Sequence, residues 1–121
     1  KDDLVAHIRK VVKNKDLEIN VLNAKEASKF SPTDSRSFKI IEELCKGILP
    51  NAVVAPYLVM GGTDAYHYEP ICENINRFAP FILDIGLLRC AHGTNERLPI
   101  STMEKGLVFF KNYIRRASAE N

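Results

Sequence analysis

The sequence predicts an α/β fold preceded by the tail of a small α+β unit. The nearly unbroken apolar run AVVAPYLVM, at residues 52–60, is typical of a strand buried on both faces of an α/β sheet. Amphipathic helical patterns lie before and after that run. Near the N-terminus, a helical pattern is followed by one alternating segment, and such a pair cannot bury its apolar faces alone. The 121 residues are enough for one domain at most.

The N-terminal unit consists of one helix and one strand. Residues 3–13 carry apolar side chains at helical spacing, with Lys and Arg on the other face. Residues 17–22 alternate apolar and polar side chains, which predicts a half-buried strand. We assign residues 1–24 to this tail. The polar stretch at residues 25–33, which ends in Ser-Pro, is expected to be a connector.

Residues 34–121 are expected to form the main domain. Its first helix is capped by Thr33 or Asp34, and its apolar stripe contains Phe38, Ile41, Leu44, Cys45 and Ile48. After the apolar run, we expect a short helix around residues 70–78 and a short strand within residues 81–87.

The last helix is predicted over residues 100–118. Ser101 and Glu104 form an S-x-x-E capping box at its start. The stripe predicted to be buried consists of Met103, Leu107, Phe110 and Ile114.

Composition limits the classes of partner. The net charge is +2 and the basic residues are dispersed, which argues against a nucleic-acid-binding surface. No apolar run is long enough to cross a membrane. Three widely separated cysteines favour free thiols in a reducing compartment, so we expect a cytoplasmic protein. The chain begins with Lys1 rather than Met, so we expect a processed or engineered N-terminus.

A candidate ligand-binding loop follows the apolar run. Gly61, Gly62, Thr63 and Asp64 stand where a strand of an α/β sheet would end, and ligands bind at such ends. Bare glycine N–H groups there can meet a carboxylate or carbonyl oxygen. An ordinary tight turn explains the same four residues, and spacing alone favours that explanation.

A candidate metal ligand lies in the loop CAHGTNERLP, at residues 90–99. His92 precedes the last helix, and neutral imidazole is the commonest protein ligand for divalent metals. The companions that the chain offers have no recognised metal-binding spacing to it, so a solvent-facing histidine remains an equal alternative. These companions are Asp64, His67, Glu69 and Glu96.

Taken in order, three stretches resemble a known family. SPTDSRSFKIIEELCKGILPNAVVAPYLVMGGTDAYHY, then RFAPF, then HGTNERLPISTMEKGLVFFKNYI are similar to the C-terminal part of the aminoacylase, carboxypeptidase S and glutamate carboxypeptidase family of zinc peptidases. The resemblance covers residues 31–121, with a carboxypeptidase S-like branch nearest. It implies that residues 34–121 are the C-terminal part of a catalytic domain, a mixed sheet flanked by helices. Residues 1–24 resemble the last helix and strand of that family's lid, or dimerisation, domain.

The resemblance also implies a chemistry. The family's site holds two zinc ions bridged by a carboxylate and a water, with a glutamate as general base, and hydrolyses a small peptide or N-acyl amino acid. His92 matches a metal ligand, and Asn95 and Glu96 match positions that support its loop. Residues 61–64, Gly61 to Asp64, match the substrate-binding loop. Many relatives carry a basic residue where this chain has Tyr66, and a phenol cannot replace a bidentate arginine, so carboxylate recognition there is in doubt.

The family's other ligands and its general base belong to an N-terminal segment that does not match any part of this sequence. We therefore expect a C-terminal fragment that contains no catalytic residue and is inactive alone. We also expect exposed apolar surface and a homo-oligomer. The alternative is a non-catalytic binding or dimerisation module that kept the fold and lost the metal.

Overall fold

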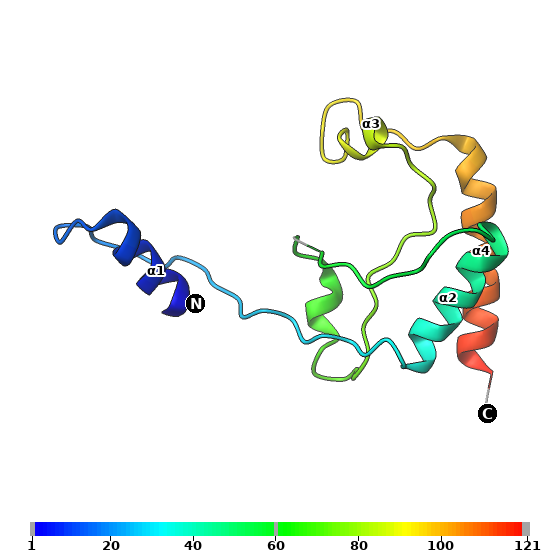
Figure 1. Ribbon diagram of the computed structural model, residues 1–121, viewed down its shortest axis with the longest axis horizontal. Helices are drawn as coiled ribbons and strands as arrows, with labels where there is room; N and C mark the ends of the chain where they lie inside the picture. Colours follow the sequence, from blue (N-terminus) through cyan, green and yellow to red (C-terminus); the bar gives the residue numbers. More distant parts are fainter. Residues whose placement is uncertain (1, 60, 120–121) are drawn as a thin grey trace.

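The computed structural model describes residues 2–59 and 61–119, and the elements in these ranges are helical (Figure 1). They are α1 (Asp2–Val12), α2 (Arg36–Ile48), the short 3-10 helix η1 (Asp64–His67), α3 (Ile85–Leu88) and α4 (Ile100–Ser118). The helices predicted over residues 3–13, 34–48 and 100–118 are confirmed. Long irregular segments connect them.

The described residues contain no β-strand, so the predicted sheet is not observed. Residues 17–22, 52–59 and 81–84 are irregular, and residue 60 lies outside the described residues. Residues 85–87 of the strand predicted within residues 81–87 belong instead to the helix α3. A strand exists only when a neighbouring strand accepts and donates its backbone hydrogen bonds. No such neighbour lies beside these segments in the described ranges, so their apolar side chains remain exposed: Val53 is 91% exposed and Leu58 63%.

The core lies between α2 and α4, which run side by side (Figure 1) and are the described helices that contact each other. Ile40 and Ile41 of α2 and Phe109 of α4 are buried, and the Phe109 ring is 5.1 Å from that of Phe78. The buried Thr102 hydroxyl accepts a hydrogen bond of 2.9 Å from the Ile82 N–H. This bond fixes an irregular segment to the helix pair.

The predicted buried stripe of α4 is wrong by one position. The buried residues are Thr102, Gly106 and Phe109. The predicted residues are all exposed: Met103 by 41%, Leu107 by 66%, Phe110 by 39% and Ile114 by 63%. Both stripes are largely apolar or small, so periodicity alone does not decide which of them α2 covers.

The predicted helix starts also need correction. Ser35, rather than Thr33 or Asp34, caps α2, because its Oγ accepts from the Phe38 N–H at 3.3 Å. At α4 the capping box of Ser101 and Glu104 is not formed. The helix begins at Ile100 with Pro99 as its cap, so Ser101 already lies inside the first turn.

Arg36 joins the start of α2 to the end of α4. Its guanidinium donates to the carbonyl oxygens of Arg116 at 2.7 Å, Ala119 at 2.9 Å and Ala117 at 3.1 Å. A positive charge at a helix C-terminus is favoured by the helix dipole. Arg116 also forms an ion pair with Glu43 of α2.

The connector runs between α1 and the helix pair (Figure 1). Ser31 Oγ donates to the Ile75 carbonyl oxygen at 2.8 Å and accepts from the Ile75 N–H at 2.7 Å. The predicted helix around residues 70–78 is absent from this described stretch, which begins with turns that follow η1. Asn74 and Asn76 are weak helix formers.

The N-terminal helix α1 contacts none of the other described helices. Its apolar side chains are exposed, with Leu4 at 63% and Val11 at 62%. The expectation of exposed apolar surface is therefore confirmed for this helix and for α4.

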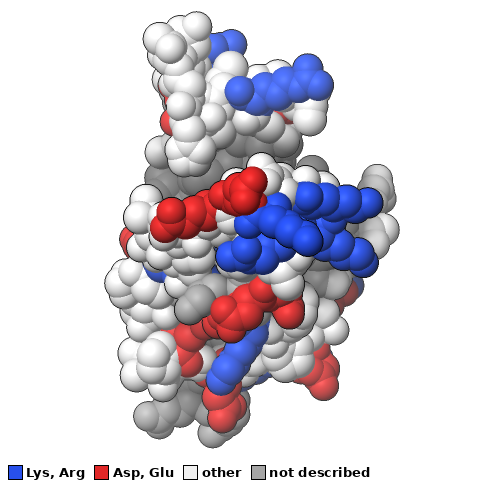
Figure 2. Space-filling model, turned by 90° about the vertical axis from the view of Figure 1, so that its left-hand side faces the viewer, with Lys and Arg blue, Asp and Glu red and all other residues white. Residues whose placement is uncertain are grey.

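The charged surface is mixed. Figure 2 shows Lys and Arg side chains next to Asp and Glu side chains, so this face is not uniformly basic. Among the described residues, no helix combines the length and the apolar character that crossing a membrane requires.

Candidate functional site

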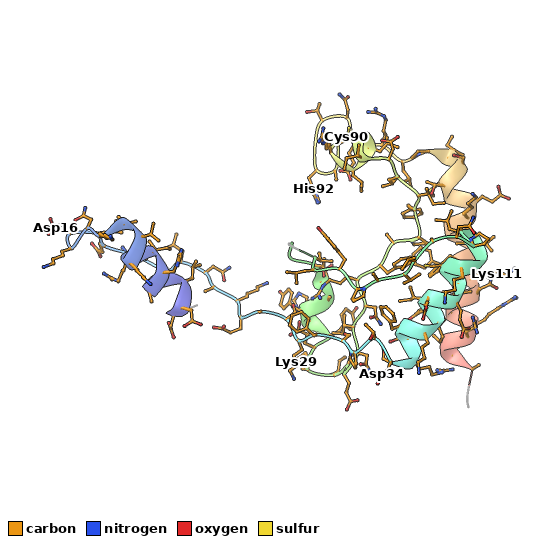
Figure 3. The ribbon with its side chains drawn as sticks, in the orientation of Figure 1. Asp16, Lys29, Asp34, Cys90, His92 and Lys111 are labelled. Carbon is orange, nitrogen blue, oxygen red and sulfur yellow. The ribbon has the colours of Figure 1, made fainter. Side chains whose placement is uncertain are left out.

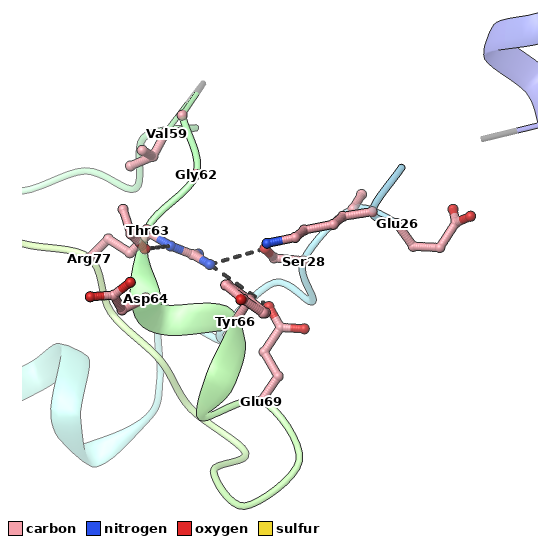
Figure 4. Close-up of a pocket in the computed structure, with 12 residues that line it drawn as sticks. Glu26, Ser28, Val59, Gly62, Thr63, Asp64, Tyr66, Glu69 and Arg77 are labelled. Atoms are coloured by element: carbon pink, nitrogen blue, oxygen red, sulfur yellow. Dashed lines mark hydrogen bonds and ion pairs between the residues drawn. The ribbon is translucent and has the colours of Figure 1, made fainter. Parts of the chain in front are cut away.

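A groove of about 960 Å³ lies between the connector and the loop that contains residues 61–64 (Figure 4). We call it the connector groove. Its lining comprises Lys25, Glu26, Ala27, Ser28, Val59, Gly61, Gly62, Thr63, Asp64, Tyr66, Glu69 and Arg77. All four residues predicted to bind substrate therefore line one cavity.

The loop at one wall of the connector groove leads into η1. Thr63 caps this 3-10 helix, because its Oγ1 accepts from the Ala65 N–H at 3.3 Å. Gly61 and Gly62 are exposed, and their φ angles are not positive. A Cβ atom at either glycine would meet no atom within 4 Å. The described fold therefore does not itself require glycine at these two positions, and space for a bound group remains beside them.

Arg77 crosses the connector groove. Its Nε donates to Thr63 Oγ1 at 3.0 Å, and its Nη2 donates to Ser28 Oγ at 3.0 Å. The same Nη2 lies 3.8 Å from a carboxylate oxygen of Glu69. Arg77 thus ties the connector to the loop, while Glu69 balances its charge.

Tyr66 provides an aromatic surface in the same cavity. The Nζ atom of Lys25 lies 3.4 Å from the centroid of the Tyr66 ring, within the range of a cation–π contact. The His67 ring lies on Tyr66 with its centroid 3.8 Å away. Many relatives were expected to carry a basic residue at position 66. In this chain that position is Tyr66, whose ring contacts Lys25 of the connector.

The loop that carries His92 is separate from the connector groove. Asp84 caps α3, because its Oδ1 accepts from the Leu87 N–H at 2.9 Å. His92 follows this helix with a φ of 61°, in the left-handed region that few residues other than glycine adopt. Its backbone N–H donates to Glu96 Oε2 at 3.0 Å. In Figure 3 the His92 ring points out of the loop and away from α4.

Neighbouring residues close this loop. The Gly93 N–H donates to the Cys90 carbonyl oxygen at 2.9 Å. Arg97 Nη1 donates to the Asn95 carbonyl oxygen at 3.1 Å. The side chains of Glu96 and Arg97 thus bind the backbone of the loop, Asn95 contributes its backbone carbonyl, and the described residues provide no hydrogen bond to the imidazole nitrogens of His92.

We expect Glu96→Ala to loosen this loop. Without the carboxylate, the His92 N–H loses its acceptor while the backbone stays in a strained conformation. Because one exposed hydrogen bond contributes about 1 kcal/mol, the amide exchange of His92 should accelerate about fivefold, as measured by NMR. Glu96→Gln keeps an oxygen acceptor and is the control. Equal exchange in the Ala variant and the unchanged chain would contradict this role.

The structure does not unite the predicted site residues into one centre. Within residues 2–59 and 61–119, no three His, Cys, Asp or Glu side chains are close enough to hold a metal ion. Among the companions considered for His92, Glu96 meets its backbone, whereas Asp64 and Glu69 line the connector groove. The sequence reading missed Lys25, Ser28 and Arg77, which no local motif marks.

A thiol nucleophile is not favoured. Cys45, Cys72 and Cys90 are free, as expected. Burial raises the pKa of the Cys45 thiol, which lowers its thiolate fraction. The Cys90 thiol donates to the Gly86 carbonyl oxygen at 3.3 Å.

Comparison with known proteins gives the family. Probable carboxypeptidase S-like 2 of Dictyostelium discoideum is 31% identical over 115 residues, 94% of the chain. The chain belongs to the carboxypeptidase S-like family. A second relative is the N-fatty-acyl-amino acid synthase/hydrolase PM20D1 of Xenopus tropicalis, which is 27% identical over 94% of the chain. Carboxypeptidase S of Saccharomyces cerevisiae is 27% identical over 81% of it.

The family that the motifs indicated is therefore confirmed. The carboxypeptidase S-like chain spans 22% of the length of the first two relatives and 18% of the yeast protein. No family model matches it. No solved structure matches it.

Proposed function

We propose that this chain is the C-terminal part of a metal-dependent hydrolase that cleaves an amide bond in a small peptide or an N-acyl amino acid. The names of its relatives, carboxypeptidase S and N-fatty-acyl-amino acid synthase/hydrolase, support hydrolysis of this class of bond. The observation that carries the proposal is that Gly61, Gly62, Thr63 and Asp64 line one open groove, with Gly61 and Gly62 exposed at its wall.

His92 is the residue that we propose as a zinc ligand. Its ring is exposed, and Glu96 fixes its backbone, so the imidazole is presented at a defined place in the loop. The described residues contribute this one ligand and do not fit a complete zinc site by themselves, because no further His, Cys, Asp or Glu group completes it among them. We therefore assign no catalytic step to the described side chains, and the remaining ligands and the general base would come from outside them.

The second candidate is a non-catalytic binding or dimerisation module. The exposed apolar stripe of α4, which a partner surface could cover, is the observation that motivates it. A homo-oligomer that covers this stripe would agree with either candidate.

Zinc analysis of the longer protein that contains this chain separates the two candidates. We expect near-stoichiometric zinc, hydrolysis of N-acyl amino acids or dipeptides, and loss of that hydrolysis on chelation. The 121-residue chain alone should be inactive. A longer protein that binds no zinc and hydrolyses neither class of substrate would support the binding module instead.

A further inference from the structure

We propose that the ammonium group of Lys25, held over the Tyr66 ring, is the subsite of the connector groove that binds a ligand carboxylate. The identity of the ligand, a small peptide or N-acyl amino acid, rests on the proposed function. The location of the subsite rests on the contacts and charges of the groove itself.

Lys25 is placed by an aromatic contact. Its Nζ lies 3.4 Å from the Tyr66 ring centroid, so the ring face occupies one side of the ammonium group. An ammonium group carries three N–H donors, and those that do not face the ring remain available. Within residues 2–59 and 61–119, Lys25 forms no ion pair with an acidic side chain. Its positive charge is therefore positioned but not neutralised.

Arg77 is the other cation of the groove, and a carboxylate of the chain already lies beside it. Two of its nitrogens donate to Thr63 and Ser28, and Glu69 lies 3.8 Å away. A ligand carboxylate at Arg77 would have to compete with Glu69 for the guanidinium. At Lys25 there is no such competitor among the described acidic side chains, so the lysine is the better anion site.

Two further acidic residues, Asp64 and Glu26, line the groove. Figure 4 shows the carboxylates of Asp64 and Glu26 directed away from Arg77 and Tyr66. The N–H groups of Gly61 and Gly62 make no hydrogen bond to other described residues. They provide neutral donors on the loop wall for an oxygen atom of the same ligand.

This arrangement also accounts for Tyr66. A phenol at this position carries no positive charge, but its ring face attracts a cation from the connector. Lys25, from a different segment of the chain, thus places beside Tyr66 the positive charge that a tyrosine does not carry.

NMR titration of the 121-residue chain, labelled at its lysines and tyrosines, tests the subsite without any catalysis. The probes are N-acetylglycine and N-acetylglycinamide, which differ in having or lacking the carboxylate. We expect the Lys25 and Tyr66 signals to shift with the acid, which should bind at least about threefold more tightly than the amide. Equal shifts with both probes, or none with the acid, would overturn the proposal. Inorganic phosphate is a third probe, and shifts equal to those with the acid would overturn the assignment to a carboxylate.

Five variants locate the effect. Lys25→Gln and Tyr66→Leu should abolish the preference for the acid, whereas Tyr66→Phe should keep it, because only the ring face is needed. Lys15→Gln, at another exposed lysine outside the groove, is the matched control and should change nothing. Adding Tyr66→Arg to Lys25→Gln should restore the preference by returning a cation to side chain 66. Retention of the preference in Lys25→Gln, or its loss in Lys15→Gln, would refute the role of Lys25.

Kinetics of the longer protein give an independent readout. Lys25→Gln should raise KM about tenfold for a substrate with a free carboxylate and leave kcat unchanged, because the contact binds substrate without taking part in bond cleavage. An amidated substrate should be insensitive to the substitution. If the longer protein hydrolyses nothing, the proposed function fails, and the NMR contrast still decides whether Lys25 binds a carboxylate. If Lys25→Gln lowers kcat instead, the subsite as proposed is wrong.

Discussion

His92→Asn in the longer protein is expected to lower zinc-dependent hydrolysis at least about a hundredfold, because losing a metal ligand costs more than losing one of the outer groups that orient it. The carboxamide cannot coordinate zinc as an imidazole nitrogen does. Asparagine also tolerates the φ of 61° found at this position better than alanine does. The substitution therefore removes the ligand while keeping the loop conformation.

Zinc content and activity are the measurements. Zinc per polypeptide should fall together with kcat/KM, while the free energy of unfolding, measured with both proteins metal-free, stays within about 0.5 kcal/mol of that of the unchanged protein. The control is His7→Asn, at an exposed histidine on α1 that we assign no metal. If His92→Asn keeps full zinc content and activity, His92 does not belong to the metal site.

Gly106→Ala is expected to destabilise the chain, although alanine is the better helix former. A Cβ atom at Gly106 would lie 2.6 Å from Cε1 of Phe81, far inside van der Waals contact. Overpacking of this kind costs about 1–3 kcal/mol, whereas the gain in helix propensity is about 1 kcal/mol. The net loss should reach up to about 2 kcal/mol, measured by urea unfolding.

Gly47→Ala is the matched control, because it is also a glycine in a helix but has no atom within 4 Å of the added Cβ. It should stabilise the chain by about 0.5–1 kcal/mol. Phe81→Leu in the Gly106→Ala background should relieve part of the clash, so the two substitutions should not be additive. If both alanine substitutions stabilise the chain, the Phe81 ring moves away from the added Cβ atom without lowering the free energy of unfolding, and the predicted clash is wrong.

Local patterns predicted the three long helices because a helix satisfies its own hydrogen bonds. The sequence ranges of α1, α2 and α4 were therefore readable from spacing alone. The strand at residues 52–60 was not observed, because a strand requires a partner that local sequence cannot identify. The face of α4 was misassigned for a related reason, since two neighbouring stripes compete and only the position of α2 decides between them.

The candidate site was also partly predictable. The tetrad from Gly61 to Asp64 was expected to line a ligand cavity, and it does line the connector groove. Arg77 and Lys25 were missed, because their contacts join segments that are distant in sequence: Arg77 reaches Ser28 over 49 positions. No period or motif encodes such a contact.

The double hydrogen bond between Ser31 and Ile75 has a mechanical consequence. Together with the bond between Arg77 and Ser28, it fastens the second half of the connector to the segment that follows η1. A rotation of α1 relative to the helix pair must therefore occur about backbone positions that precede Ser28. Such a rotation would first displace the residues next to Lys25.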